Sequence, residues 1–163
     1  MTHYPVMFTF RDVVSGNDFL AGVTLSGRAL VVKEGESEWC VYGVRPAAIA
    51  EVGTTVEEAF LRFRNRYKAV LFDIAEESGN FDAFRKEVER FYYEPDSSEE
   101  QRWEEAFLAI RSGKVIPEKP ISDLRRESPE SRPSQIAVAR LDEMKRFRAN
   151  DNVSDTLVMA TAA

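Results

Sequence analysis

The spacing of apolar residues along the chain changes abruptly near Gly53. Before it, apolar and polar residues alternate in short segments such as VMFTFRDVV, and turn-forming residues separate these segments. After it, apolar residues recur every three or four positions, the spacing of amphipathic helices. The sequence therefore predicts an α+β fold: an antiparallel β-meander of three or four strands packed against amphipathic helices, with a C-terminal linker and helix.

The strands are expected between Pro5 and Val44. The sequence SGND predicts the first turn and EGES the last. Between these turns, Ser26 and Gly27 form a two-residue connection of the hairpin type. The expected strands are VMFTFRDVV, FLAGVTL, RALVVKE and EWCVYGV. One face of this meander is expected to be covered by the helices that follow.

A capping signal opens the first helix. Thr54 is followed three residues later by Glu57, and Thr55 by Glu58, so both registers satisfy a capping box. The apolar stripe that begins at Val56 predicts a helix to about residue 77. Two further amphipathic helices are expected, one over residues 80–93 and one that begins at Ser97 or Ser98 and ends before Gly113.

The last third of the chain differs in composition. Four prolines, at positions 117, 120, 129 and 133, fall in a segment that is rich in charge and serine. We therefore expect an α+β domain over residues 1–113, a Pro-rich linker over 114–134, and a C-terminal helix and tail over 135–163. The apolar stretch DTLVMATAA near the end is open to three interpretations: an added strand, a partner-docking peptide or a frayed terminus.

Composition and charge exclude several classes of function. The net charge is -6, and residues 114–163 carry nine Lys or Arg against eight Asp or Glu, so the acidic excess lies before residue 114. Such a field repels nucleic acid and attracts basic proteins. A single cysteine and a single histidine allow neither a disulfide nor a thiolate or two-histidine metal site. We expect no cofactor, no metal, no membrane segment and a cytoplasmic location.

The segment EWCVYGVRPAAIAEVGTTVEEAFLRFRNRY resembles the HicB-like antitoxin fold over about residues 38–72. In that family a strand leads through a Pro-containing loop into a small strand, then into Gly-Asp/Thr-Thr-x-Glu-Glu-Ala and a long amphipathic helix. The matching motif here runs from Gly53 to Ala59. The loop itself diverges: the chain has Val-Arg-Pro-Ala-Ala at residues 44–48 where the family has a Pro-Asp-Leu-Pro-Gly-like sequence. The resemblance implies that this loop, with Arg45, faces a partner protein.

Members of that family typically neutralise a small basic RNA-cleaving toxin, and many carry a C-terminal DNA-binding segment. The resemblance therefore implies a basic protein partner, whereas the chain shows no convincing helix-turn-helix or ribbon-helix-helix segment. Acidic helix faces and aromatic side chains are the natural contacts for such a partner. The candidate partner-binding residues are Arg45, Glu57, Glu58, Tyr92, Tyr93, Glu99, Glu100 and Glu104. For Glu57 and Glu58, helix capping is the competing interpretation, and for the aromatic residues it is packing in the core.

The leading hypothesis is a non-enzymatic protein-binding module of the antitoxin or inhibitor type, which neutralises a basic partner by occlusion. One alternative is an immunity-type or phage-borne inhibitor of a defence protein. Another is a nucleic-acid-binding transcriptional regulator that uses Arg140, Lys145, Arg146 and Arg148. A carboxylate-bound magnesium enzyme would need convergence of Asp12, Asp18 and Asp73, which nothing in the sequence requires. Homo-oligomerisation stays open.

Overall fold

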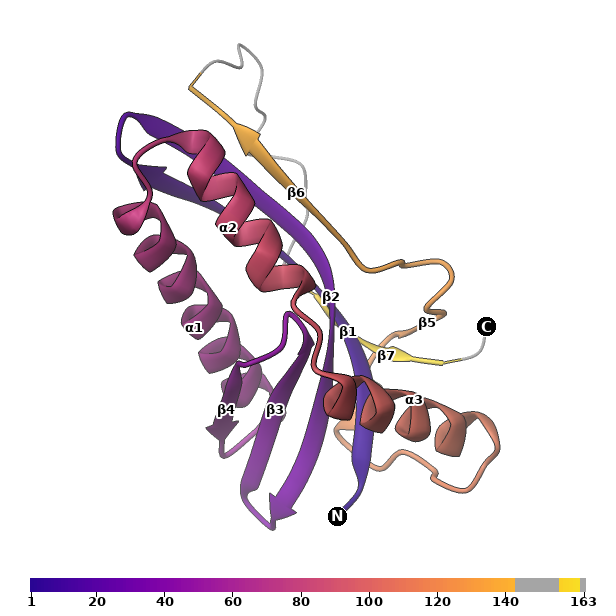
Figure 1. Ribbon diagram of the computed structural model, residues 1–163. Coiled ribbons are helices and arrows are strands. Elements are labelled where there is room, and N and C mark those ends of the chain that lie inside the picture. The colour runs from indigo at the N-terminus through magenta and orange to yellow at the C-terminus, as the bar shows by residue number, and fades with distance from the viewer. Residues whose placement is uncertain (143–155, 162–163) are drawn as a thin grey trace.

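The computed structural model describes residues 1–142 and 156–161. It shows a mixed α+β fold with a seven-stranded, mostly antiparallel sheet and helices against both of its faces (Figure 1). The first strands are β1 (His3–Gly16), β2 (Phe19–Gly35), β3 (Glu38–Arg45) and β4 (Ala50–Gly53). The helices are α1 (Val56–Glu77), α2 (Phe81–Tyr93) and α3 (Ser97–Arg111). The later elements are η1 (Ile121–Asp123), β5 (Arg126–Glu127), β6 (Gln135–Arg140) and β7 (Leu157–Ala160).

A long hairpin of β1 and β2 forms the centre of the sheet. The two strands pair without interruption from His3 opposite Val32 to Gly16 opposite Phe19. The predicted turn in SGND is confirmed, with Asp18 in the left-handed conformation at φ 59. The predicted hairpin turn at Ser26 and Gly27 is wrong, because β2 runs straight through these residues.

Gly27 has a packing role in place of the predicted turn role. A Cβ atom at Gly27 would lie 2.5 Å from both the Arg45 carbonyl oxygen and the Phe8 ring. The glycine therefore lets the Phe8 ring and strand β3 approach β2 closely. The predicted meander is accordingly built from β1, β2 and β3, and the short β4 completes it.

The outer strands attach to both edges of this hairpin. The order across the sheet is β4-β3-β2-β1-β7-β5, and β6 also pairs with β2. Two strands share the edge of β2 that faces away from β1. Strand β3 pairs with residues 28–35 of this edge, and β6 pairs with residues 21–26. The parallel β5–β7 pair follows at the β1 edge.

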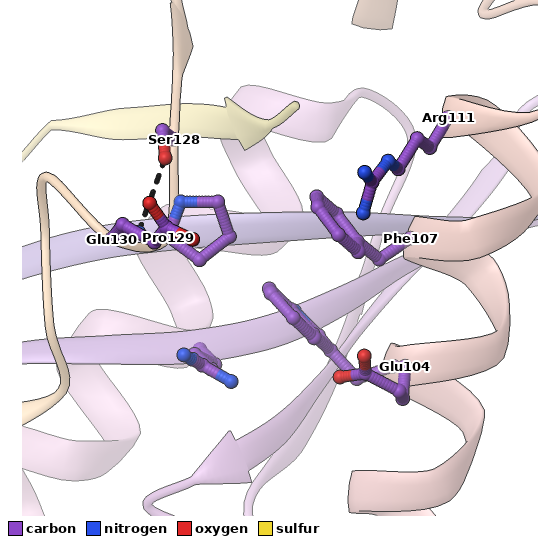
Figure 2. A pocket seen from close by; sticks show the side chains of 8 residues that line it. Glu104, Phe107, Arg111, Ser128, Pro129 and Glu130 are labelled. Atoms are coloured by element: carbon purple, nitrogen blue, oxygen red, sulfur yellow. Dashed lines mark hydrogen bonds between the residues drawn. The ribbon is translucent and has the colours of Figure 1, made fainter. Parts of the chain in front are cut away.

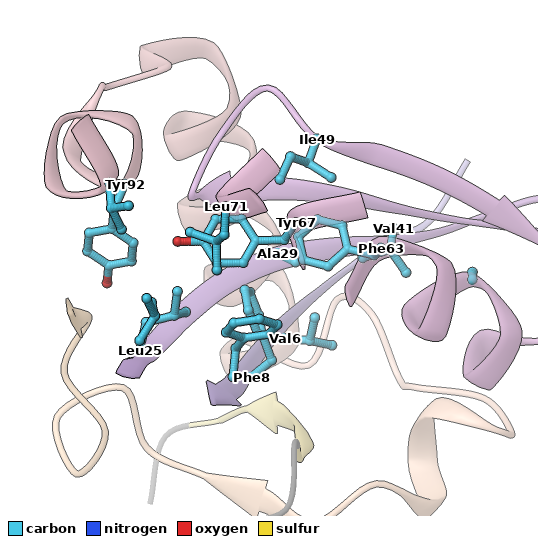
Figure 3. Packing of buried hydrophobic residues seen from close by; sticks show 14 of the residues in the cluster. Val6, Phe8, Leu25, Ala29, Val41, Ile49, Phe63, Tyr67, Leu71 and Tyr92 are labelled. Carbon is cyan, nitrogen blue, oxygen red and sulfur yellow. The ribbon is translucent and has the colours of Figure 1, made fainter. Parts of the chain in front are cut away.

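The larger core lies between the sheet and helices α1 and α2. Val6 and Phe8 of β1 lie in this core with Phe63 and Tyr67 of α1 (Figure 3), and Phe10 belongs to the same cluster. The Phe8 and Phe63 rings form an edge-to-face contact at 5.3 Å between centroids, as do Phe10 and Tyr67 at 4.9 Å. This is the contact that the apolar stripe of α1 predicts.

Helix α3 packs on the opposite face of the sheet. Its Trp103 is 2% exposed, packs in the same cluster as Met7 and Leu30, and donates from Nε1 to the Val6 carbonyl oxygen at 3.2 Å. Residues of β1 that alternate with Phe8 thus face a second apolar layer. The expectation that all helices cover one face is therefore wrong, because β1 and β2 are apolar on both faces.

The C-terminal part of the chain adds strands to the sheet. Residues 135–140, which the sequence assigns to a helix, form β6, because Ile136 and Val138 alternate along the open edge of β2. Residues 157–160 form β7, which confirms the added-strand interpretation of DTLVMATAA. Within the segment expected to be a linker, Ile121 is fully buried. The rest of the predicted helix, from residue 143, lies outside the described residues.

Candidate functional site

Glu58 belongs to the cap of α1. Its Oε2 accepts hydrogen bonds from the Thr54 backbone N–H at 2.7 Å and hydroxyl at 2.6 Å, and its own N–H donates to Thr55 Oγ1 at 3.1 Å. The bond from the Thr54 hydroxyl holds the pKa of Glu58 below its usual value. Thr55 is the N-cap residue. The capping interpretation therefore accounts for Glu58, while Glu57 lies exposed beside it in the first turn.

The two adjacent tyrosines at the end of α2 have different environments. Tyr92 is fully buried, and its hydroxyl donates to the Ser26 carbonyl oxygen at 2.6 Å. Burial raises the pKa of Tyr92 to about 12. The side chain of Tyr93, by contrast, is 49% exposed. One of the two tyrosines thus lies at the surface, as expected, and Tyr92 is part of the core.

Arg45 joins three elements at the start of α3. Its guanidinium forms an ion pair with Glu100 at 2.6 Å and lies 6.0 Å from the centroid of the Tyr93 ring. The ends of β3 and α2 therefore meet the first turn of α3. The N-cap of that helix is Asp96, whose carboxylate accepts from the Glu99 backbone N–H at 3.1 Å.

Acidic side chains continue along α3. Glu99 accepts from Arg102 at 3.0 Å, and Glu104 lies exposed one turn beyond Glu100. Arg45 joins Tyr93 and Glu100, and it lines one cavity with Glu100 and Glu104. We call these four residues, together with Glu99 of the first turn of α3, the α3 surface. Four of the predicted partner-binding residues thus lie together, whereas Glu57 and Glu58 lie at the start of α1, beside β4.

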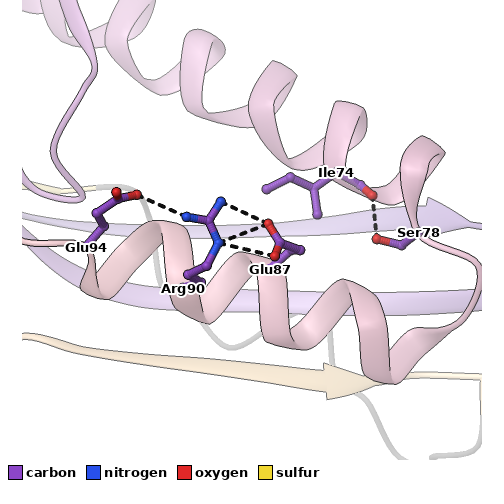
Figure 4. A network of polar contacts seen from close by, with 5 residues as sticks. All are labelled: Ile74, Ser78, Glu87, Arg90 and Glu94. Atoms are coloured by element: carbon purple, nitrogen blue, oxygen red, sulfur yellow. Dashed lines mark hydrogen bonds and ion pairs between the residues drawn. The ribbon is translucent and has the colours of Figure 1, made fainter.

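The acids on the outer face of α2 are largely paired within the helix. Arg90 forms ion pairs with Glu87 at 3.0 Å and Glu94 at 3.2 Å (Figure 4). In the same view, Ser78 donates to the Ile74 carbonyl oxygen at the end of α1. The surface ion pairs reduce the net field of α2, and α3, with four glutamates against two arginines, is more acidic than α2.

Two adjoining cavities, which we call the α3 groove, separate α3 from the segment around Pro129. Each has a volume of about 310 Å³, and both are lined by Arg28, Trp103 and Glu104. In Figure 2, Glu104, Phe107 and Arg111 from α3 face Ser128, Pro129 and Glu130 across the first cavity. The second cavity reaches Arg45 and Glu100 of the α3 surface.

Arg28 is the residue of this site that sequence reasoning missed. Its guanidinium lies 4.4 Å from the centroid of the Trp103 ring. Burial lowers the pKa of Arg28, and the negative charge of Glu104 opposes this effect. The available signal was a single charge at the start of the apolar segment RALVV, next to the predicted turn at Ser26 and Gly27.

The residues proposed for nucleic-acid binding are only partly described. Arg140 donates to Asp142 at 3.0 Å and to the Asp18 carbonyl oxygen at 3.0 Å, so its guanidinium helps to hold the end of β6 beside the β1–β2 turn. Lys145, Arg146 and Arg148 lie outside the described residues.

One group of potential metal ligands occurs in the described part of the chain. Ligand atoms of Glu34, Glu38 and Cys40 lie within 4.8 Å of one another at the β2–β3 turn. The Tyr42 hydroxyl donates to Glu34, and burial raises the pKa of the Cys40 thiol, so Cys40 keeps its proton. We assign no metal to this group. Asp12, Asp18 and Asp73 form no such group within residues 1–142 and 156–161.

Comparisons with protein-family models, with curated proteins and with solved structures found no match. Within the described ranges, no helix is both long and apolar enough to cross a membrane.

Proposed function

We propose that the protein is a non-enzymatic binding module of the antitoxin or inhibitor type, which neutralises a basic protein by covering its active site. The observation that carries this proposal is the α3 surface. Residues that are distant in sequence, from Arg45 to Glu104, gather there around an exposed tyrosine. Aromatic and arginine side chains surrounded by charge are typical of the anchoring points of protein interfaces.

Electrostatics supports a basic partner. The chain has a net charge of -6, and α3 places four glutamates in its first nine residues, SSEEQRWEE. Complementary potentials speed the encounter of two proteins, and the rate falls as salt is added. A small basic enzyme would therefore be drawn to the α3 surface and held there by Tyr93 and Arg45.

The resemblance of residues 38–72 to HicB-like antitoxins supports the same class of partner. Gly53 of the shared motif lies at a close approach in this chain, because a Cβ atom there would be 2.5 Å from the Ala59 nitrogen. The motif thus has a structural purpose that is separate from partner binding. For this reason the proposal rests on the α3 surface, and the resemblance indicates only which class of partner protein to test.

The test uses the small basic proteins encoded beside the gene for this chain. Each is expressed alone and together with this protein, and growth rescue is scored; association rates are then measured with the purified pair at two salt concentrations. In the variant E99Q/E100Q/E104Q we expect rescue to be lost and low-salt association to slow by about tenfold. The matched control E36Q/E76Q/E77Q removes the same charge from exposed positions elsewhere and should retain rescue.

Equal effects of the two triple variants would contradict the assignment of the α3 surface. If neither the wild type nor either variant rescues growth against any neighbouring basic protein, the antitoxin proposal itself is contradicted. Steeply salt-dependent DNA binding that is lost when Arg140, Lys145, Arg146 and Arg148 are changed to Gln would favour the regulator instead.

A further inference from the structure

Arg28 is a half-buried cation that forms no direct ion pair with any described residue, although Glu104 lines the same cavities. Its Nε atom is buried and has no hydrogen-bond partner. Within the described part of the chain its guanidinium takes part in no ion pair, and the neighbouring Arg45 is already paired with Glu100 at 2.6 Å. A charge that is partly removed from water is costly unless an opposite charge or hydrogen bonds compensate it. The fold therefore maintains an unsatisfied positive group.

The surroundings of Arg28 supply a flat apolar wall. One face of the Trp103 ring lies against the guanidinium at 4.4 Å. Phe107 stacks on Trp103 with 5.7 Å between ring centroids and 8° between planes, and it lines the first cavity opposite Pro129 (Figure 2). A ligand that reaches Arg28 thus passes between an aromatic ring and a proline, both of which favour a flat apolar group.

The size of the groove limits its occupant. The two cavities that share Arg28 measure about 310 Å³ each, at the lower end of the range for small-molecule sites, which is roughly 300–1,000 Å³. One ring with a short polar group fits within either cavity.

The nearby acids decide between classes of anion. Glu104 lines both cavities and Glu130 lines the first. Two carboxylates near the cation repel a doubly charged phosphate more strongly than a singly charged carboxylate. A carboxylate also matches the planar fork of an arginine.

We propose that the α3 groove is a binding site for a monocarboxylate that carries a flat apolar group, with Arg28 as the counter-ion and Phe107 and Pro129 as the wall. This site goes beyond the proposed protein-binding function and does not depend on it. The same chemistry occurs in free aromatic acids and in the C-terminal residue of a peptide, and the experiment separates these two sources.

The experiment follows the two tryptophan indole N–H signals of the full chain by ¹H–¹⁵N NMR. Trp103 borders the groove, whereas Trp39 packs in the other core cluster and serves as an internal reference. The probes are benzoate with its neutral counterpart benzamide, and acetyl-Gly-Phe with a free or an amidated terminus. With the carboxylates we expect a saturable shift of the Trp103 signal, which reaches half of its final size at a ligand concentration of about 1 mM or below. With the neutral counterparts we expect no shift.

Variants then test the role of Arg28. R28M keeps the length of the side chain and should weaken benzoate binding by about tenfold or more. R28K retains a charge without the planar fork and should weaken it by less, which provides a second variant if R28M fails to fold. The control R66M removes an exposed arginine from α1, on the far side of the sheet, and should bind as the wild type does.

Tighter binding of the free peptide than of benzoate would identify a peptide terminus as the source, and the reverse would identify a small acid. Equal shifts with benzoate and benzamide, unchanged binding by R28M, or tighter binding of inorganic phosphate than of benzoate would each overturn the proposal.

Discussion

At the scale of single residues, Tyr67 and Tyr92 bury the same functional group in different ways. The Tyr67 hydroxyl is buried and has no hydrogen-bond partner among the described residues, whereas that of Tyr92 donates to the Ser26 carbonyl oxygen at 2.6 Å. An unsatisfied buried hydroxyl costs about 1–3 kcal/mol. We therefore expect Y67F to raise the free energy of unfolding by about 1 kcal/mol, as measured by urea denaturation.

Y92F is the matched comparison, because it removes a hydroxyl that has a partner. It should lower the free energy of unfolding by about 1 kcal/mol, because the hydrogen bond to the Ser26 carbonyl oxygen is lost. If both substitutions change stability in the same direction, the difference between the two hydroxyl environments is contradicted.

The raised pKa of Tyr92 makes stability depend on alkaline pH. Its pKa rises from 10.0 to about 12 because folding buries the phenol. Below pH 10 both the folded and unfolded states hold the proton, so the full contribution to stability is present there. As pH rises from 10 towards 12 the unfolded state loses the proton first, and stability falls. Urea denaturation at pH 9, 10 and 11 should show this fall, and Y92F should make it shallower. If the stability of Y92F falls as steeply with pH as that of the wild type, the fall belongs to other titrating groups.

Local patterns predict residues whose role is local. The capping box was visible in the sequence because Thr55 and Glu58 lie three residues apart. The Glu58 backbone N–H donates to the Thr55 hydroxyl, and the Glu58 carboxylate accepts from the backbone N–H of the preceding Thr54. Arg28 could not be predicted as a site residue, because its wall comes from Trp103 and Pro129, far along the chain. No spacing rule connects those positions.

At the scale of elements, the sequence predicts the helices well and the strands less well. The three helices begin within about one residue of their expected caps, since capping and apolar spacing are local signals. Strand β2 was divided in error at Ser26 and Gly27. The reason for that glycine is the approach of Phe8 and Arg45 from other strands, which a local pattern cannot reveal.

The role of Gly27 can be tested by adding a single methyl group. A Cβ atom there would lie 2.5 Å from the Arg45 carbonyl oxygen, which is backbone and cannot move away easily. We expect G27A to lower the free energy of unfolding by about 1–3 kcal/mol. Circular dichroism during urea denaturation measures this change.

Gly79 is the control, because a Cβ atom at that position meets nothing within 4 Å. G79A should be neutral or slightly stabilising, since alanine restricts the unfolded chain. A neutral G27A would contradict the close approach of β2, β3 and the Phe8 ring.

At the scale of the whole molecule, the α+β class followed from the change in apolar spacing, but the arrangement of layers did not. Alternation placed Phe8 and Phe10 on one face of the first strand and Met7 on the other, and helices were expected on one face only. The structure buries Met7 in a cluster with Trp103 of α3 and with Val158 of the neighbouring strand β7. Because α3 and β7 both lie far from Met7 in the sequence, only long-range packing reveals this second cluster.

Strand β7 extends the sheet beside β1 and buries side chains in both core clusters, so removing it should weaken the whole molecule. Val158, Met159 and Ala160 of β7 are fully buried, as is Ile121, and β7 pairs with β1 at Val6, Met7 and Phe8. The loss of one large core side chain typically costs 2–5 kcal/mol. We therefore expect a chain that ends at Gly113 to lose more than about 4 kcal/mol of unfolding free energy, measured by urea denaturation.

M159A in the full chain provides a smaller perturbation of the same contact, with an expected loss of about 2–4 kcal/mol. Its matched control is L108A, since Leu108 lies on α3 and is 49% exposed, so it should change stability by less than about 1 kcal/mol. If the truncated chain unfolds at the same urea concentration as the full one, residues 114–163 are a separable tail. The burial of β7 would then contribute nothing to the stability of residues 1–113.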